Sequence, residues 1–377
     1  MKCTKSPRKL LIFIISFIVG FCLAFAGFFI FKSLFPHSEP IAEIAETAET
    51  APKPEPEPLK QPITLSFTGD ISLADNWYIA PKYDERGGIT GIFGDTMLET
   101  MKNSDFLVVN SEFTVSNRGT ALANKMYTFR AKPERLAIYH EMGVDLADLA
   151  NNHVYDYGET AFLDMLDSFN QHQIPYFGAG RNLEEAKKPH IVTLGDYKIA
   201  FVAATRAEKN VMTPAATANK PGTFWCYDPT EMTELIKTLR QDQTIDFIIP
   251  IIHFGRENSH DLEKAQVDSA RAYIDAGADM VVGHHAHVLQ GVEIYQDKPI
   301  IYNLGNFLFN HLEVDTALFQ VIINPDRQLE YYILPALQQD SKTILLPDGD
   351  KKQQIINDIN SWSINAHLDQ NGKIIKQ

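Results

Sequence analysis

Three histidines stand within four positions in the segment VVGHHAHVLQ, directly after an apolar run. They are His284, His285 and His287. Neutral imidazole is the commonest side-chain ligand of metal ions in proteins. The pattern alone is equally compatible with buried histidines that hydrogen-bond to backbone, so a metal site needs further ligands from other parts of the chain.

Polar side chains also follow four other apolar runs of the sequence. They are Asp70, Asn110, Glu112, Asn151, Asn152, His153 and His253. Each pattern alone is typical of a turn or of a hydrogen-bonded buried residue. Jointly they predict a site, because the carboxyl ends of parallel strands meet at one edge of an α/β sheet and buried charges there need a compensating cation. Oxygen and imidazole donors suit manganese, zinc or iron, and we expect one or two such divalent ions.

Composition narrows the possible sites and partners. Cys3 and Cys22 fall in the N-terminal segment, which leaves Cys226 as the one thiol of the remaining chain. A cysteine-based zinc cluster and an internal disulfide are therefore excluded there. The formal net charge of −14 repels phosphate backbones, so we expect no nucleic-acid partner.

Apolar runs alternate with helical patterns from residue 63 onward, which predicts an α/β domain. Two hairpins are expected at 191–205 and 292–307, with turns at Gly195-Asp196 and Gln296-Asp297. The other predicted strands lie at 63–70, 105–112, 145–153, 174–180, 246–255, 279–285 and within 317–335. Helices are predicted at 133–143, 159–172, 229–242, 261–277 and 350–365.

The N-terminus has the pattern of a membrane anchor. Residues 1–9 are basic, and residues 10–31 carry no charge and would span ~33 Å as a helix. The basic flank should stay in the cytoplasm, which places the C-terminal domain outside the cell in a single-pass topology. A cleaved signal at AFA (24–26) and a lipid anchor at Cys22 are alternatives. A linker rich in Pro and Glu follows at 32–62, and the folded domain is expected at 63–377.

Several motifs together resemble the CapA-type capsule biosynthesis proteins, which are associated with poly-γ-glutamate synthesis and related to calcineurin-like metallophosphoesterases. They occur in the family's order within residues 63–310. They are FTGDISL (67–73), NSE (110–112), YTFRAKPE (127–134), ANNHVYDYG (150–158), HFGRE (253–257), GHHAHVLQGVE (283–293) and YNLGNF (302–307).

The resemblance implies a four-layer α/β/β/α metallophosphoesterase-like sandwich and assigns roles to the polar residues. Asp70 corresponds to the first metal-binding aspartate, Glu112 to the bridging carboxylate, and Asn152 and His253 to further ligands. His153 corresponds to the histidine that protonates a leaving group. Two of His284, His285 and His287 would also bind metal, and which two stays open. The phosphoesterases have Asp-x-His at the first motif, where this chain has Asp70-Ile71-Ser72, and Asp at the bridging position, where it has Glu112.

Three functions are compatible with these features. The first is a membrane-anchored component of poly-γ-glutamate or capsule polymer production or export, with membrane-bound synthase subunits as partners. The second is an exported metal-dependent phosphoesterase or hydrolase, and the third is a non-catalytic subunit of a polymer synthase. Arg130 and Arg206 are candidates for binding an anionic polymer or a phosphorylated substrate, because guanidinium pairs with carboxylate and phosphate. Either arginine could instead form a surface ion pair.

Overall fold

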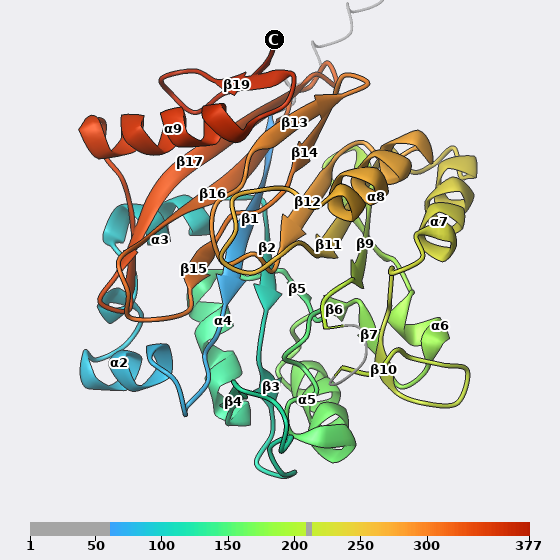
Figure 1. The fold of residues 1–377 in the computed structure, drawn as a ribbon, viewed down its shortest axis with the longest axis vertical. Coiled ribbons are helices and arrows are strands. Elements are labelled where there is room, and N and C mark those ends of the chain that lie inside the picture. Colours follow the sequence, from blue (N-terminus) through green and yellow to red (C-terminus); the bar gives the residue numbers. More distant parts are fainter. Residues whose placement is uncertain (1–60, 209–212) are drawn as a thin grey trace, which may run out of the picture. The chain divides into compact units, whose positions relative to one another are not determined.

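Two β-sheets form the centre of the part of the chain that the structure describes. This computed structural model describes residues 61–208 and 213–377 (Figure 1). The predicted basic segment at 1–9, the anchor at 10–31 and the linker up to residue 60 lie outside these ranges. Within them, no helix is both long and apolar enough to cross a bilayer. The mixed α/β fold is confirmed, and the anchor stays a prediction.

The first sheet has eight strands with β1 at its centre. β1 pairs in parallel with β2 and β15 and antiparallel with β16. β5 and β6 continue the parallel half, and β17 and β18 continue the antiparallel half. The strands are β1 (Ile63–Ile71), β2 (Phe106–Ser111), β5 (Leu146–Asp148), β6 (Tyr176–Phe177), β15 (Asn306–Leu308), β16 (Val314–Ile323), β17 (Leu329–Gln339) and β18 (Lys342–Leu345).

The second sheet has six strands in the order β13-β14-β12-β11-β9-β8. Its four inner strands are parallel, and each predicted hairpin adds one antiparallel edge strand. In the second hairpin Gln296 and Asp297 both have positive φ, at 50° and 63°, as the tight turn between two strands requires. The strands are β8 (His190–Leu194), β9 (Tyr197–Thr205), β11 (Phe247–His253), β12 (Val281–His284), β13 (Val292–Tyr295) and β14 (Lys298–Ile301).

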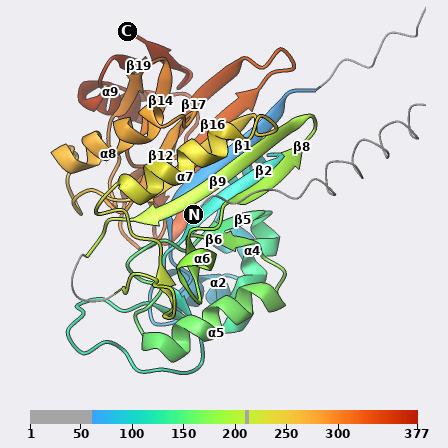
Figure 2. The same cartoon turned by 90° about the vertical axis from the view of Figure 1, so that its right-hand side faces the viewer.

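Helices cover the outer side of each sheet (Figure 2). Those on the first sheet are α2 (Ile79–Glu85), α3 (Asp95–Lys102), α4 (Ala137–Met142) and α5 (Gly158–Gln171), and those on the second are α7 (Thr230–Gln241) and α8 (Lys264–Asp275). α9 (Asp350–Trp362) packs against the core between the sheets. The shorter elements are β3 (Thr114–Val115), β4 (Arg130–Ala131), β7 (Ala179–Gly180), β10 (Gly222–Thr223), β19 (Ala366–Leu368), β20 (Ile374–Lys376), α6 (Leu183–Ala186), η1 (Ile89–Gly91) and η2 (Pro133–Leu136).

Strand periodicity explains why each sheet can have a core on both faces. Successive side chains of a strand point to opposite faces. In β2, Leu107 and Val109 pack toward the helices, whereas Phe106 and Val108 pack into the core between the sheets. Near-continuous apolar strands such as β2 and β11 are therefore buried on both faces.

One predicted strand is interrupted. The prediction of a single strand at 174–180 was wrong, because the structure divides this segment into β6 and β7 at Gly178. Gly178 has φ 83°, and a Cβ atom there would lie 2.6 Å from the Cβ of Ala150. The close approach to the turn after β5 therefore requires glycine and breaks the strand.

Candidate metal centre

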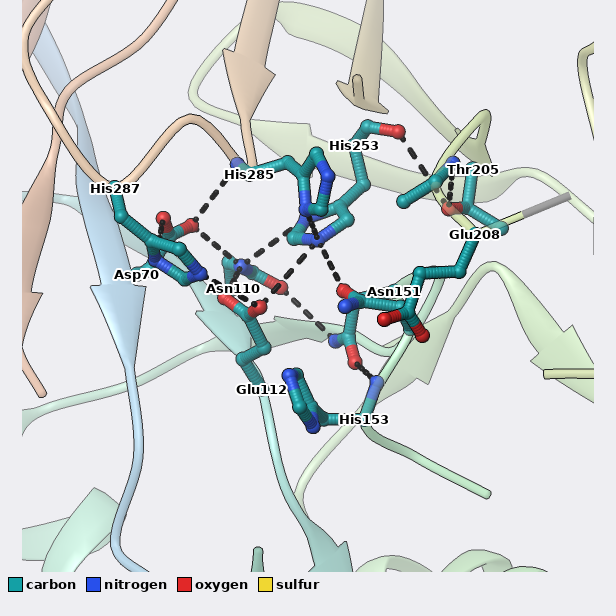
Figure 3. A network of polar contacts seen from close by, with 12 residues as sticks. Asp70, Asn110, Glu112, Asn151, His153, Thr205, Glu208, His253, His285 and His287 are labelled. Atoms are coloured by element: carbon teal, nitrogen blue, oxygen red, sulfur yellow. Dashed lines mark hydrogen bonds and ion pairs between the residues drawn. The ribbon is translucent and has the colours of Figure 1, made fainter. Parts of the chain in front are cut away.

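The polar ends of strands from both sheets meet at one place. Parallel pairing sets Asp70 of β1 beside Asn110 of β2, and His253 of β11 beside His284 of β12. Gly69 allows β1 to approach the 302–307 segment, since a Cβ atom there would lie 2.1 Å from the carbonyl oxygen of Gly305. Figure 3 shows the side chains from these strand ends pointing toward one another.

Two buried carboxylates each leave one oxygen without a hydrogen bond. The amide Nδ2 of Asn110 donates to Asp70 Oδ1 at 2.8 Å and to Glu112 Oε2 at 3.1 Å. The other two oxygens, Asp70 Oδ2 and Glu112 Oε1, accept none, although both residues are fully buried. Buried carboxylate oxygens without partners are unfavourable unless a cation compensates them.

Imidazole nitrogens lie beside these two oxygens. His287 Nδ1 is 3.1 Å from Asp70 Oδ2, and His287 Nε2 is 3.7 Å from Glu112 Oε1. His253 Nε2 is 3.5 Å from the same Glu112 oxygen. Two sets of side chains have ligand atoms within 4.8 Å of one another and could hold a metal ion, namely Asp70 with Glu112 and His253, and Glu112 with His285 and His287. Glu112 belongs to both sets.

Burial dominates the electrostatics of this centre. It raises the pKa of Glu112 well above its ordinary value, and the charge of Asp70 adds to this effect. Burial also opposes ionisation of Asp70, but contact with His287 outweighs it and lowers the pKa of Asp70. Burial and neighbouring imidazoles lower the pKa of His253 well below its usual range and that of His285 to about 3. Both rings are therefore neutral and have lone pairs for a cation.

The loop after β12 determines which of His284, His285 and His287 face the carboxylates. His285 and His287 have φ of 95° and 58°, a conformation that non-glycine residues rarely adopt and that clusters at functional sites. Both are members of the second ligand set. His284 is in neither set, and its Nε2 lies 2.9 Å from the backbone oxygen of Thr68. Its Nδ1 is buried without a hydrogen-bond partner, and metal binding by His284 stays a prediction.

The turn after β5 supplies Asn152 and His153. Asn152 Oδ1 lies 2.8 Å from His253 Nε2, and its Nδ2 is buried without a partner. Asn151 holds the turn, because its Nδ2 donates to Asn110 Oδ1 at 3.0 Å and its Oδ1 accepts from the His153 backbone N–H at 3.0 Å. The turn therefore reaches the centre through Asn152 and leaves the ring of His153 beside it.

The sequence did not predict two residues that hold His153. Asp156 Oδ2 lies 2.8 Å from His153 Nδ1, and Asp156 Oδ1 is 2.8 Å from the ammonium of Lys125. The side chain of Lys125 is only 3% exposed, and its ammonium contacts Glu208 Oε2 at 3.0 Å and donates to the backbone oxygen of Asn152. The spacing His-x-x-Asp at 153–156 was a usable signal for Asp156. Lys125 has none, because it lies in a polar loop.

The two predicted substrate-binding arginines have other partners. The Arg130 guanidinium lies 4.3 Å from the ring centre of Tyr157, and that of Arg206 lies 5.3 Å from the ring centre of Tyr227 and donates to its backbone oxygen at 3.0 Å. Neither lines the cleft that contains His153 and His287. Substrate binding by these arginines stays a prediction.

The residues at this centre fit a divalent ion. Carboxylate, amide and imidazole donors converge, and the buried Oε1 of Glu112 accepts no hydrogen bond. Manganese, zinc and iron all accept this mixture of oxygen and nitrogen. Among the described residues no cysteine contributes, since Cys226 is a buried free thiol packed among the residues between the second sheet and its helices.

Comparisons with known proteins match most of the folded part of the chain. Residues 64–311 match the family model described as bacterial capsule synthesis protein PGA_cap. The capsule biosynthesis protein CapA of Bacillus anthracis is 30% identical over 266 residues, which cover 68% of this chain and 63% of that protein, less than two thirds of its length. The PGA biosynthesis protein CapA of Bacillus subtilis (strain 168) is 29% identical over 318 residues, covering 83% of this chain and 81% of that protein.

Solved structures show weaker similarity. A phosphatase from Mycoplasma pneumoniae has a TM-score of 0.44 and 13% identity, and the match covers 74% of this chain and 95% of that one. The NAD nucleotidase NadN of Haemophilus influenzae has a TM-score of 0.43 and 14% identity, covering 81% of this chain and 57% of that one.

Proposed function

The chain belongs to the bacterial capsule synthesis protein family PGA_cap, and from this premise we propose that it acts in producing or exporting an extracellular poly-γ-glutamate or capsule-like polymer through a divalent-metal centre. The names of its Bacillus relatives, a capsule biosynthesis protein and a PGA biosynthesis protein, support the polymer. The proposal of a metal centre rests on one observation. Glu112 Oε1 is buried, accepts no hydrogen bond and lies beside the imidazoles of His253 and His287.

Asp70, Glu112, His253, His285 and His287 would hold one or two ions, with Glu112 shared if two bind. Asn152 would complete the donors through Oδ1, which already reaches His253. A bound manganese, zinc or iron ion supplies a Lewis acid that polarises a carbonyl or phosphoryl oxygen. The layer order of helices, two sheets and helices, with a core between each pair of layers, supports the metallophosphoesterase-like sandwich.

Residues of the chain itself would transfer the proton that a leaving group needs. Asp156 accepts a hydrogen bond from Nδ1 of His153, so Nε2 is the nitrogen that would give a proton to a leaving group once the ring is protonated. Lys125 compensates the buried charge of Asp156 and keeps the turn at Asn152 in place. His153 lines the cleft and is therefore accessible to a ligand, whereas Asp156 is fully buried.

We further propose that residues 10–31 anchor the chain in the cell membrane, with residues 63–377 outside. The uncharged length of this segment and the basic residues before it support that topology. The anchor would place the metal centre beside membrane-bound synthase subunits, where a polymer emerges.

Complementation of a deletion strain tests this function. Cells would carry wild type, Asp70→Asn, His253→Ala, the remote control His172→Ala, or a chain lacking residues 1–31, and released polymer would be measured as glutamate after acid hydrolysis. We expect wild-type levels from His172→Ala and loss of polymer from both centre variants, at equal protein abundance. Polymer retained by the centre variants but lost on removing residues 1–31 would instead establish a non-catalytic subunit.

The pairing of His153 with Asp156 favours a second candidate, an exported metal-dependent phosphoesterase. The full-length protein would be loaded with Mn²⁺ or Zn²⁺ and incubated with 4-nitrophenyl phosphate and bis(4-nitrophenyl) phosphate. Turnover that disappears in His153→Ala while cells carrying that variant still produce polymer would favour this candidate over the first.

A further inference from the structure

A cleft of about 290 Å³ opens beside the metal centre, and His153 and His287 line it. Its volume lies near the lower end for small-molecule sites, so it has room for the last unit or two of a polymer and not for a long stretch. A γ-glutamyl polymer could present an amino end, an internal unit or a carboxyl end to this cleft. These parts differ in charge, so the charges of the cleft distinguish them.

The amino end is the part of a γ-glutamyl polymer that has a cation. Each bond joins the γ-carboxyl group of one unit to the α-amino group of the next, so every unit keeps a free α-carboxylate. The carboxyl end has an additional free γ-carboxylate. The first unit alone keeps its α-amino group, which is protonated at neutral pH. A site for an internal unit therefore binds an anion, whereas a site for the amino end binds an anion and a cation on the same carbon atom.

The metal centre forms the side of the cleft that suits an anion. His287 lines the cleft and lies beside the carboxylates of Asp70 and Glu112. The divalent ion that the proposed function places on these residues adds positive charge at this point. Carboxylate oxygens are ordinary ligands of manganese, zinc and iron. An α-carboxylate that enters the cleft therefore finds its counter-charge at the metal centre.

Glu257 supplies the opposite charge. It is exposed, it ends the HFGRE motif, and it is the one carboxylate among the described residues that line the cleft. It lies near enough to His287 and Glu112 for its charge to act on both. The adjacent Arg256 pairs with Asp261 instead, at 3.9 Å, and among the described residues no lysine or arginine pairs with Glu257. The carboxylate of Glu257 is therefore available to a cation of a ligand.

Aromatic rings form one wall of the same cleft. Trp77 lies at the centre of this wall, with ring-centroid distances of 4.6 Å to Tyr78, 5.8 Å to Tyr127 and 5.0 Å to Phe129. Tyr127 is 52% exposed and Tyr78 is 38% exposed, so the wall presents ring surface to solvent. The faces of aromatic rings attract an ammonium group and also pack against methylene groups. Aromatic rings and a carboxylate in one cleft are a combination that suits an ammonium group.

We propose that this cleft binds the amino end of a γ-glutamyl polymer, with the α-carboxylate of the first unit at the metal centre and its α-ammonium at Glu257. The methylene groups and the neutral amide that follow pack on the rings of Trp77 and Tyr127. An internal unit would leave Glu257 without a cation, and a carboxyl end would bring a second anion instead of one. The inference deepens the proposed function, on which it rests for the identity of the polymer, by naming the part of the polymer that the site takes.

Saturation-transfer NMR titrations of the Zn²⁺-loaded, full-length protein test the inference. The probes are γ-glutamylglutamate, its N-acetyl derivative and free glutamate, each in the D and the L form. We expect γ-glutamylglutamate to bind about fivefold more tightly than its N-acetyl derivative, because acetylation removes the cation and leaves every carboxylate. Free glutamate should bind more weakly than γ-glutamylglutamate, because it places a charged γ-carboxylate against the rings where the dipeptide has a neutral amide.

A pair of matched variants tests the assignment to Glu257. Glu257→Gln should bind γ-glutamylglutamate and its N-acetyl derivative equally, because the amide of Gln has no charge to pair with the ammonium. Glu184→Gln changes an exposed carboxylate outside the cleft and should keep the fivefold preference of the wild type, to within about a factor of two.

Metal removal separates this inference from the proposed function. With chelator, both dipeptides should bind more weakly by the same factor, and the preference for the free amine should persist. A preference that depends on Glu257 but not on metal upholds binding of the amino end and counts against the metal centre. Metal-dependent binding of both dipeptides with equal affinity overturns the inference and leaves the metal centre standing. Absence of binding, a preference that survives Glu257→Gln, or free glutamate binding as tightly as the dipeptide also overturns it.

Discussion

Replacing Glu112 by Gln should have opposite effects on the metal-free and the metal-loaded protein. The side chain is fully buried, and its Oε1 accepts no hydrogen bond. In the metal-free protein this oxygen has no hydrogen-bond donor, whereas Asp70 Oδ2 lies 3.1 Å from His287 Nδ1. The amide of Gln is nearly the same size as the carboxylate but carries no charge, so the change tests the charge rather than the packing.

The expected magnitudes follow from burial and mass action. A buried, unsatisfied acceptor costs about 1–3 kcal/mol, so metal-free Glu112→Gln should be more stable than wild type by about that amount at pH values above the raised pKa of Glu112, where its carboxylate is charged. An ion at about 100 times its Kd stabilises the wild type by about 2.7 kcal/mol. At about 2 °C per kcal/mol for a protein of this size, the wild-type Tm should rise by about 5 °C with metal. The variant lacks the shared ligand and should show little of this rise.

Thermal unfolding of the full-length protein, with chelator and then with Mn²⁺, Zn²⁺ or Fe²⁺, measures both effects. Glu293→Gln is the matched control, because Glu293 is equally buried but has partners, Arg271 Nη2 at 2.6 Å and the Tyr302 hydroxyl at 2.5 Å. Glu293→Gln should be less stable than wild type and should keep the metal-induced rise in Tm. The reasoning fails if Glu112→Gln destabilises the metal-free protein as Glu293→Gln does, or if it retains the full rise with metal.

Three other predictions concern residues around the centre. Lys125→Met leaves the buried charge of Asp156 unpaired and should lower the free energy of unfolding by about 3–5 kcal/mol in urea titrations, whereas Arg118→Met, which breaks a surface pair, should leave it unchanged within error. His153→Ala should reduce turnover of any ester the protein hydrolyses by about 100- to 10,000-fold while the metal-induced Tm rise persists; a lost rise would show that the histidine holds the metal instead. Burial raises the pKa of Asp148 to about 8, so the folded protein binds this proton more tightly than the unfolded chain and loses stability as pH rises from about 4 to about 8. Asp148→Asn has no such proton, so its stability relative to wild type should increase over that pH range in chelator, and a constant difference would contradict the assignment.

Local patterns predicted most of the larger elements. The near-continuous apolar runs of β2 and β11 predicted strands buried on both faces. The proline and the glycine at the ends of 133–143 predicted where the helical segment made of η2 and α4 begins and ends. The short helices α2 and α3 were not predicted. In α3 the buried residues are Met97, Leu98 and Met101, which is too little of a repeat to distinguish from a loop.

The sequence by itself determined which chemical groups end the strands, because residue type and local periodicity are properties of short segments. Asp70, Glu112 and His253 could be proposed as ligands on that basis alone. Only the tertiary structure decided how those groups face one another. The left-handed backbone at His285 and His287 turns their rings to the carboxylates while His284 turns to Thr68, and Lys125 reaches Asp156 across segments far apart in the chain. Such contacts depend on how strands and loops pack in three dimensions, and no local pattern contains that information.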